Sequence, residues 1–281
     1  MALKRKVNSR YHAQLLLALL FLSILPAYTF ALETKAQLTG RDAAGSVVPA
    51  AVEWSQSQWS DAASFPEPAN AAQMRALINN IWRDVVQSWR LRAVPGVREG
   101  ASPQLNIVSK VAAGHCYGIY ISAGPVYCTG NGTIFVSIDE MTRLADRFGE
   151  RADAALSFLI AHEFGHHVQL INHRFGELAR LVSDAPERRR EYSLRFELEA
   201  DCLAGVWASH STSFAASEST QNNIIEALDL VGDDKVQLAA FGTADPSTYW
   251  HGTSAQRARW FMIGKQYESP QVCDVLNAND Y

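Results

Sequence analysis

Five consecutive residues near the middle of the chain, His162 to His166, could hold and use a metal ion. His162 and His166 are four positions apart, about one turn of an α-helix, so both imidazoles can reach the same ion. Glu163 lies beside that face, near enough to take a proton from a metal-bound water. This HExxH arrangement is typical of zinc hydrolases, although three fixed positions in five also occur by chance. His167 points about 100° away from His166 and is expected to be a polar or packing residue.

A second helical stretch offers the third ligand that a catalytic zinc ion usually has, beside an open position for water. Glu197 and Asp201 are again one turn apart. We expect Glu197 to bind the metal and Asp201 to accept a hydrogen bond from a ligand imidazole. Glu199 points about 200° away from Glu197 and is predicted to face solvent.

The alternative is that these acids form an exposed charged face. Apolar neighbours argue instead that the helix is mostly buried: Phe196, Leu198, Ala200, Leu203, Ala204, Val206 and Trp207. A buried carboxylate needs a partner, and a metal ion is one.

Hydrophobic periodicity predicts the elements that must position these residues. Helices are expected over 151–171, from Pro186 to about residue 210, and, shorter, over 221–231 and 254–265, with Ser254 as N-cap of the last. An amphipathic helix is expected from Met74 to Trp89, and strands over 105–111 and 134–138. The predicted fold class is α+β, mostly helical with a small sheet.

The amino terminus has the order of a secretory signal peptide. Four basic residues precede an apolar run over 15–25, and Thr29 and Ala31 fit a cleavage site. The expected organisation is a signal peptide at 1–31, a linker or loosely ordered lead-in at 32–69 and one domain at 70–281 that holds the candidate metal ligands. The alternative is an uncleaved membrane anchor over 15–32. Both place the folded part outside the cytoplasm: in the periplasm or secreted if the segment is cleaved, and attached to the membrane if it is not.

Charge excludes two classes of partner. The 281 residues carry 25 basic and 29 acidic side chains, a net charge of −4. The signal segment holds four basic residues and no acid, so the remainder has 21 against 29, or −8. A chain with this negative charge lacks the excess of positive charge that binding to nucleic acid or anionic lipid requires. A membrane contact is expected only if the amino-terminal segment is uncleaved.

Four cysteines in an exported chain indicate disulfides, with three possible pairings. Our candidates are Cys116 with Cys128, which closes a short loop, and Cys202 with Cys273, which ties the carboxyl end to a helix. A cysteine zinc site is disfavoured because the sequence contains no CxxC pair.

Several stretches resemble the "putative neutral zinc metallopeptidase" family of bacterial exported or membrane-anchored proteins, within the gluzincin group. They are AHEFGHHVQ at 161–169, ELEADCLAGVWA at 197–208, GDD at 232–234 and HGTSAQRARW at 251–260, with weaker similarity in GPVYC at 124–128. The resemblance covers most of 105–275 and leaves the first 70 residues outside. After Cys128 the chain departs from the family, having Thr129 and Gly130 where a proline and acidic residues are usual.

The resemblance implies a zincin-like fold and one zinc ion bound by His162, His166 and Glu197. It also implies Glu163 as the general base and Asp201 as the acid supporting a ligand histidine. The expected reaction is hydrolysis of a peptide bond in a peptide or protein substrate, because zinc activates water and polarises the carbonyl. We expect His251, or else Tyr249, to stabilise the oxyanion.

Two further expectations concern the substrate and the class of function. The strand at 134–138 could present an edge to an extended peptide. The alternative functions are an exported zinc-binding interaction protein without proteolytic activity, which would not need Glu163, and hydrolysis of another kind of bond.

Overall fold

The structure is a computed structural model that describes residues 70–90, 102–109 and 124–281. The predicted signal segment, the lead-in and Cys116 lie outside these ranges, so the domain boundaries and the Cys116–Cys128 pairing stay predictions. The described elements are α3 (Ala71–Arg90), β1 (Gln104–Val108), β2 (Val126–Cys128), β3 (Thr133–Ser137), α4 (Ile138–Phe148), α5 (Ala152–Ile171), α6 (Arg174–Asp184), α7 (Arg189–Ala208), α8 (Glu218–Val231), α9 (Asp233–Phe241) and α10 (Ser254–Tyr267). Short 3-10 turns lie at Gly149–Arg151, Pro186–Arg188, Pro246–Thr248 and Pro270–Cys273.

The three described strands form one small sheet in the order β1-β3-β2. β3 pairs in parallel with β1 and antiparallel with β2, so both of its edges are occupied. Every residue of β3 is buried, as expected for a central strand. The prediction that the strand at 134–138 presents a free edge to a peptide is therefore wrong, and β2 is the edge strand on that side.

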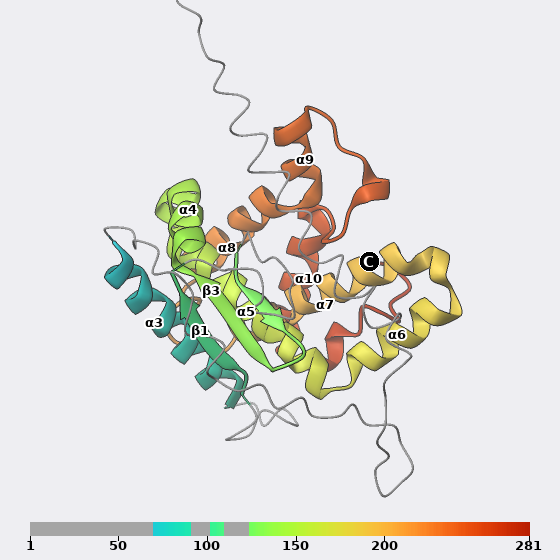
Figure 1. Ribbon diagram of the computed structural model, residues 1–281, viewed down its shortest axis with the longest axis horizontal. Helices are drawn as coiled ribbons and strands as arrows, with labels where there is room; N and C mark the ends of the chain where they lie inside the picture. Colours follow the sequence, from blue (N-terminus) through green and yellow to red (C-terminus); the bar gives the residue numbers. More distant parts are fainter. Residues whose placement is uncertain (1–69, 91–101, 110–123) are drawn as a thin grey trace, which may run out of the picture.

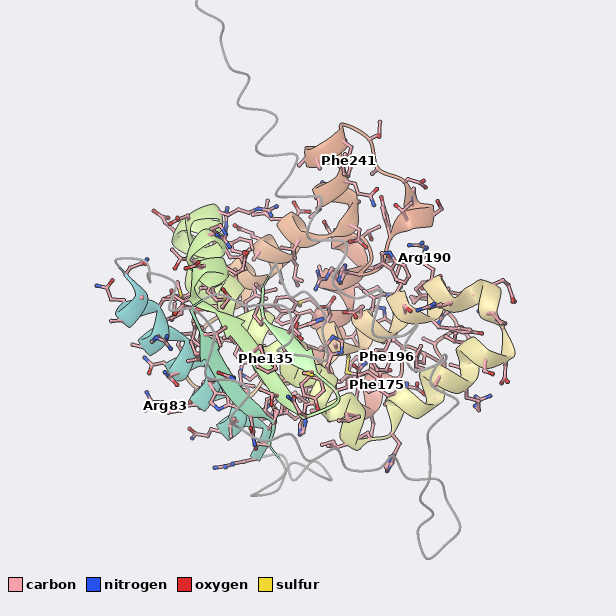
Figure 2. All side chains as sticks on the ribbon, in the orientation of Figure 1. Arg83, Phe135, Phe175, Arg190, Phe196 and Phe241 are labelled. Atoms are coloured by element: carbon pink, nitrogen blue, oxygen red, sulfur yellow. A yellow bond between two sulfur atoms is a disulfide. The ribbon has the colours of Figure 1, made fainter. Side chains whose placement is uncertain are left out.

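The long helix α5 runs through the centre of the molecule, between the sheet with α3 and α4 on one side and α7 with α10 on the other (Figure 1). Buried residues lie on all sides of α5 and α7. This fits the mostly apolar sequence of α5, whereas α7 also buries the charged residues Arg195, Glu197, Glu199 and Asp201. At one end of α7, Phe196 meets Phe175 of α6 with ring centroids 4.6 Å apart (Figure 2). None of the helices in the described ranges is both long and apolar enough to span a membrane.

α7 and α10 approach each other so closely that their backbones touch. A Cβ atom at Gly264 would lie 1.9 Å from the carbonyl oxygen of Cys202, and one at Gly205 would lie 2.0 Å from that of Phe261. Only glycine fits at these two positions. The disulfide between Cys202 and Cys273, with Cα atoms 5.5 Å apart, attaches the carboxyl-terminal segment to the same part of α7 and confirms that predicted pairing.

The α+β fold class is confirmed, and the main helices are close to their predicted bounds. The apolar stripe from Met74 to Trp89 is buried on α3. Pro186 opens a 3-10 turn, and α7 itself begins at Arg189. Ser254 is not the N-cap of α10: the cap is Thr253, whose hydroxyl accepts from the Gln256 N–H while the Gln256 side chain accepts from the Thr253 N–H.

Candidate metal centre

Two helices bring the candidate ligands together because their backbones meet at a glycine. A Cβ atom at Gly165, inside the HExxH segment of α5, would lie 3.0 Å from the carbonyl oxygen of Ala200 on α7. Glycine therefore lets α5 and α7 approach closely enough for ligands from both to converge.

His162, His166 and Glu197 form a cluster that can hold a metal ion, with one potential ligand atom from each lying within 4.8 Å of the others. The Nε2 atoms of His162 and His166 lie 3.2 and 3.4 Å from Oε2 of Glu197. Two imidazole nitrogens and one carboxylate oxygen are a donor set that catalytic zinc uses, with a further position for water. The three residues that the sequence singles out as ligands thus meet at one place.

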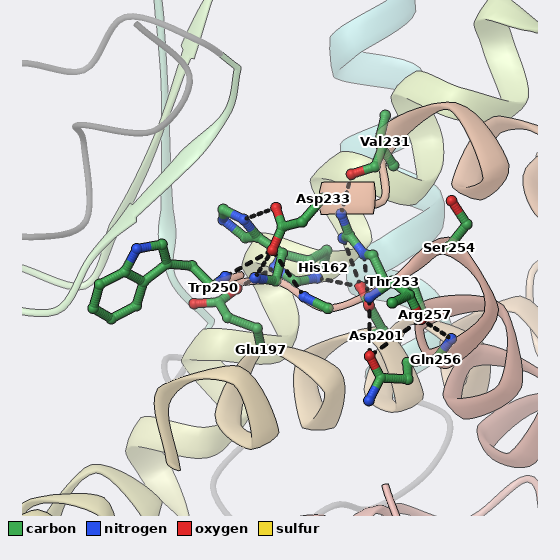
Figure 3. Close-up of polar contacts among 12 residues, drawn as sticks. His162, Glu197, Asp201, Val231, Asp233, Trp250, Thr253, Ser254, Gln256 and Arg257 are labelled. Carbon is green, nitrogen blue, oxygen red and sulfur yellow. Dashed lines mark hydrogen bonds and ion pairs between the residues drawn. The ribbon is translucent and has the colours of Figure 1, made fainter. Parts of the chain in front are cut away.

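Asp201 holds the ring of His162 from the opposite side. Its Oδ1 lies 2.8 Å from Nδ1 of His162, and Arg257 donates to both carboxylate oxygens at 2.9 Å (Figure 3). Because this carboxylate is an acceptor, Nδ1 of His162 carries the proton and Nε2 presents its lone pair to the metal position. Asp201 is fully buried, as predicted for a carboxylate that orients a ligand.

Gln169 orients the ring of His166, as Asp201 orients that of His162, through a hydrogen bond to Nδ1. Its side-chain nitrogen donates to the backbone carbonyl of Phe196 at 2.8 Å, so its Oε1 accepts from Nδ1 of His166 at 2.7 Å. Both imidazoles therefore have Nε2 available for a metal.

The negative charges of Asp201 and Glu197 favour binding of a cation at this cluster. Burial lowers the pKa of His162, but the hydrogen bonds and charges of Asp201 and Glu197 outweigh burial and raise it to about 10. Burial alone would raise the pKa of Glu197, yet His166 and His162 hold it well below its ordinary value. The negative potential that favours a proton here also favours a metal cation.

Glu163 follows the candidate ligand His162 on α5 and is hydrogen-bonded to the small sheet. The backbone N–H of Tyr127, on edge strand β2, donates to its Oε2 at 2.7 Å. Burial raises the pKa of Glu163 above its ordinary value, against the lowering effect of the neighbouring histidine charges. A raised pKa makes this carboxylate a stronger base than an ordinary glutamate.

His251 is positioned by the buried carboxylate of Asp233. Oδ2 of Asp233 accepts the backbone N–H groups of Trp250 and His251 at 2.7 Å each, and Oδ1 lies 3.3 Å from Nδ1 of His251. Burial lowers the pKa of His251, but Asp233 and Glu197 outweigh it and raise the pKa. His251 is thus held near the metal ligands, within electrostatic reach of Glu197.

The structure differs from the sequence predictions at two further side chains. Glu199 does not face solvent: it is 3% exposed and accepts from Arg174 through both oxygens. Tyr249, the second candidate for the oxyanion, is buried in the hydrophobic core. His167 is buried as expected, with its Nδ1 3.0 Å from the hydroxyl of Tyr127.

Sequence reasoning gave no role to Gln169, Asp233 and Arg257, although each left a signal. Gln169 follows His166 by three positions, on the same face of α5. Asp233 and Arg257 lie in the GDD and HGTSAQRARW stretches, in which only His251 and the expected N-cap Ser254 had been given a role.

Comparison with known proteins finds uncharacterized bacterial relatives. An uncharacterized protein of Mycobacterium tuberculosis, Rv2575, is 33% identical over 191 residues, covering 63% of this chain and 64% of the relative. The uncharacterized protein YpfJ of Escherichia coli is 33% identical over 155 residues, 54% of each chain. The chain thus spans less than two thirds of the length of these relatives. No solved structure matches the chain.

The family model described as "Putative neutral zinc metallopeptidase" matches residues 17–276. The match begins much earlier in the chain than the resemblance over 105–275 indicated. The chain therefore belongs to this family.

Proposed function

We propose that the protein is a zinc-dependent endopeptidase that hydrolyses peptide bonds with Glu163 as general base. The observation that carries this proposal is the combination of a three-ligand cluster with a separate carboxylate beside it. A protein that only binds zinc needs His162, His166 and Glu197 but has no use for a partly buried Glu163 that a hydrogen bond holds in place.

The chain's own residues can perform the remaining steps. Bound zinc would supply a Lewis acid that activates water and polarises the substrate carbonyl. Glu163 takes the proton from the attacking water through the oxygen that Tyr127 leaves open, and then delivers it to the leaving nitrogen. His251, held through Nδ1 by Asp233, donates from Nε2 to the developing oxyanion.

The outer edge of β2 supports an extended peptide as substrate. In the antiparallel pair Tyr127 lies opposite Ile134, and its N–H points toward Glu163 rather than toward β3. Its C=O points the same way, since both groups of a strand residue share one side. A substrate pairing with this edge would pass directly beside the general base.

The sequence pattern also leads us to propose export, with the folded part in the periplasm or secreted after cleavage at residue 31. Sequencing the amino terminus of the mature protein tests this part separately. A terminus at Met1 in protein recovered from the membrane would favour the anchor instead.

Metal analysis combined with a peptide-library digest tests the enzyme. We expect about one zinc per chain in the parent, and none above trace in His162→Ala. Glu163→Gln, which keeps size but removes the basic oxygen, should retain zinc and lose at least roughly 10²-fold in turnover.

Equal cleavage by Glu163→Gln and the parent would refute the proposed role of Glu163. Zinc binding by both, with cleavage of no peptide by either, would favour the non-enzymatic interaction protein.

A further inference from the structure

Arg190 is fixed in place beside the loop that carries His251. Its guanidinium lies over the ring of Trp250, 4.2 Å from the centroid, and donates to the backbone carbonyl of Thr248 at 3.1 Å. Figure 2 shows Arg190 where α7 begins, next to the segment that connects α9 to α10. A stacked and hydrogen-bonded guanidinium has lost much of its rotational freedom before any ligand arrives.

Neither contact neutralises the positive charge of Arg190. Three other arginines on or near α7 have acidic partners: Arg188 and Arg195 pair with Glu191, and Arg174 pairs with Glu199. Arg189 resembles Arg190 in forming no ion pair among the described residues, but it lacks the contacts that fix Arg190 in place. Among the described residues, no acidic side chain forms an ion pair with Arg190. Four of its five N–H donors are left for a ligand, since a single hydrogen bond is formed.

One acid lies close enough to be influenced by this charge, but its carboxylate is engaged elsewhere. Asp245 accepts from the backbone N–H and the hydroxyl of Ser247 at 2.9 and 2.7 Å. Arg190 makes only a minor contribution to lowering the pKa of Asp245. The guanidinium therefore remains available.

Arg190 and Trp250 flank the metal centre. Arg190 precedes Glu197 by seven positions, two helical turns, so both lie on the same face of α7 about 10 Å apart along its axis. Trp250 precedes His251 directly, and Figure 3 shows its indole extending away from the His162–Asp201 contacts. At roughly 3.4 Å per residue, 10 Å corresponds to about three residues of an extended peptide.

We propose that Arg190, supported by Trp250, binds an acidic side chain of the substrate within about three residues of the cleaved bond. The inference rests on the proposed peptidase function and adds a substrate class to it. A planar guanidinium matches a carboxylate with two parallel hydrogen bonds, and the match is strongest when the guanidinium is already oriented. With a net charge of −4, the chain as a whole does not attract acidic peptides. A preference for acidic over neutral substrate side chains would therefore come from this site.

The test begins with a library of peptides about ten residues long, digested by the full zinc-loaded protein and read by mass spectrometry. We expect enrichment of Asp and Glu at one position within about three residues of the cleavage. Two quenched fluorogenic peptides that differ only by Glu or Gln at that position then measure the preference. The parent should favour the Glu peptide at least roughly tenfold in kcat/KM, chiefly through KM because the contact lies away from the cleaved bond.

Arg190→Leu should bring this ratio close to one, and Arg190→Glu should invert it. Arg189→Leu and Arg189→Glu are matched controls, since they make the same charge changes one residue away on another face of α7, and they should keep the parent ratio. Circular dichroism verifies that all four variants fold.

Two results overturn the proposal: a parent that cleaves both peptides equally well, or an Arg190→Glu variant with the parent ratio. In either case the peptidase function still stands. If no peptide is cleaved, that function fails, and the acidic subsite is tested by binding alone. Fluorescence anisotropy then compares two peptides about ten residues long, with Glu or Gln at the central position, on the zinc-loaded protein. Equal affinities would then overturn the acidic subsite, and tighter binding of the Glu peptide that Arg190→Leu abolishes would support it.

Discussion

Replacing Gly165 by alanine should weaken metal binding while leaving the fold intact. The new Cβ atom would lie 3.0 Å from the carbonyl oxygen and 3.2 Å from the Cα atom of Ala200, whereas ordinary contact begins at 3.4 Å. Both obstacles are backbone atoms, so α5 and α7 have to separate by the difference, about 0.4 Å. Zinc sites tolerate deviations of roughly 0.2 Å in ligand distance, and His162 and Glu197 lie on opposite sides of this contact.

The expected loss in zinc affinity is about 10- to 100-fold, similar to the loss of a group that supports a metal ligand. Overpacking costs about 1–3 kcal/mol, and alanine recovers about 1 kcal/mol in a helix, so unfolding free energy should fall by at most about 2 kcal/mol. Competition with a chromophoric chelator measures the first quantity, and urea unfolding of the metal-free protein measures the second.

Gly176→Ala on α6 is the control, because a Cβ atom there meets no atom within 4 Å. This variant should keep the parent's zinc affinity and gain up to about 1 kcal/mol in stability. Unchanged zinc affinity in Gly165→Ala, or an equal loss in Gly176→Ala, would refute the reasoning that close helix approach sets the ligand geometry.

Asp201→Asn should lower the free energy of unfolding by about 3–5 kcal/mol, because it leaves the buried charge of Arg257 without its partner. Urea unfolding measures this, and a loss below about 1 kcal/mol would contradict it. Asp233→Asn should flatten the acid side of the stability–pH curve. Burial alone would raise the pKa of Asp233, but His251 and backbone N–H groups hold it below its ordinary value. The stabilisation is therefore complete above about pH 4 and disappears as pH falls through the lower folded-state pKa. Urea unfolding between about pH 5 and 2 should show a steeper loss in the parent, and identical slopes would exclude this contribution.

The metal ligands could be predicted from the sequence because their arrangement is local. His162 and His166 on one helix, and Glu197 and Asp201 on another, are each one turn apart, and helical periodicity alone puts each pair on one face. The apolar residues around Glu197 correctly indicated a buried helix. The same pattern could not show that Glu199 is buried too, since its partner Arg174 lies on another helix 25 residues away.

The supporting residues depend on tertiary contacts that no periodicity contains. Arg257 reaches Asp201 across 56 residues, and Asp233 holds a loop that begins 17 residues later. The central place of β3 was missed for a similar reason: β2 has three residues, too few for an alternation pattern, yet it occupies the edge that seemed free. The sequence shows which residues are present, but it does not show which side chains or strands pair with each other in the fold.

The backbone contact between α7 and α10 has a consequence for motion. Two helices that touch at Gly205 and Gly264 cannot slide past each other, because a carbonyl of one would have to pass through the backbone of the other. Glu197 lies on α7 and His251 lies three residues before α10, so we expect these two side chains to keep a nearly constant separation. Relative motion around the metal-binding cluster is instead expected between these two helices and β2, whose Tyr127 forms hydrogen bonds with Glu163 and His167 of α5.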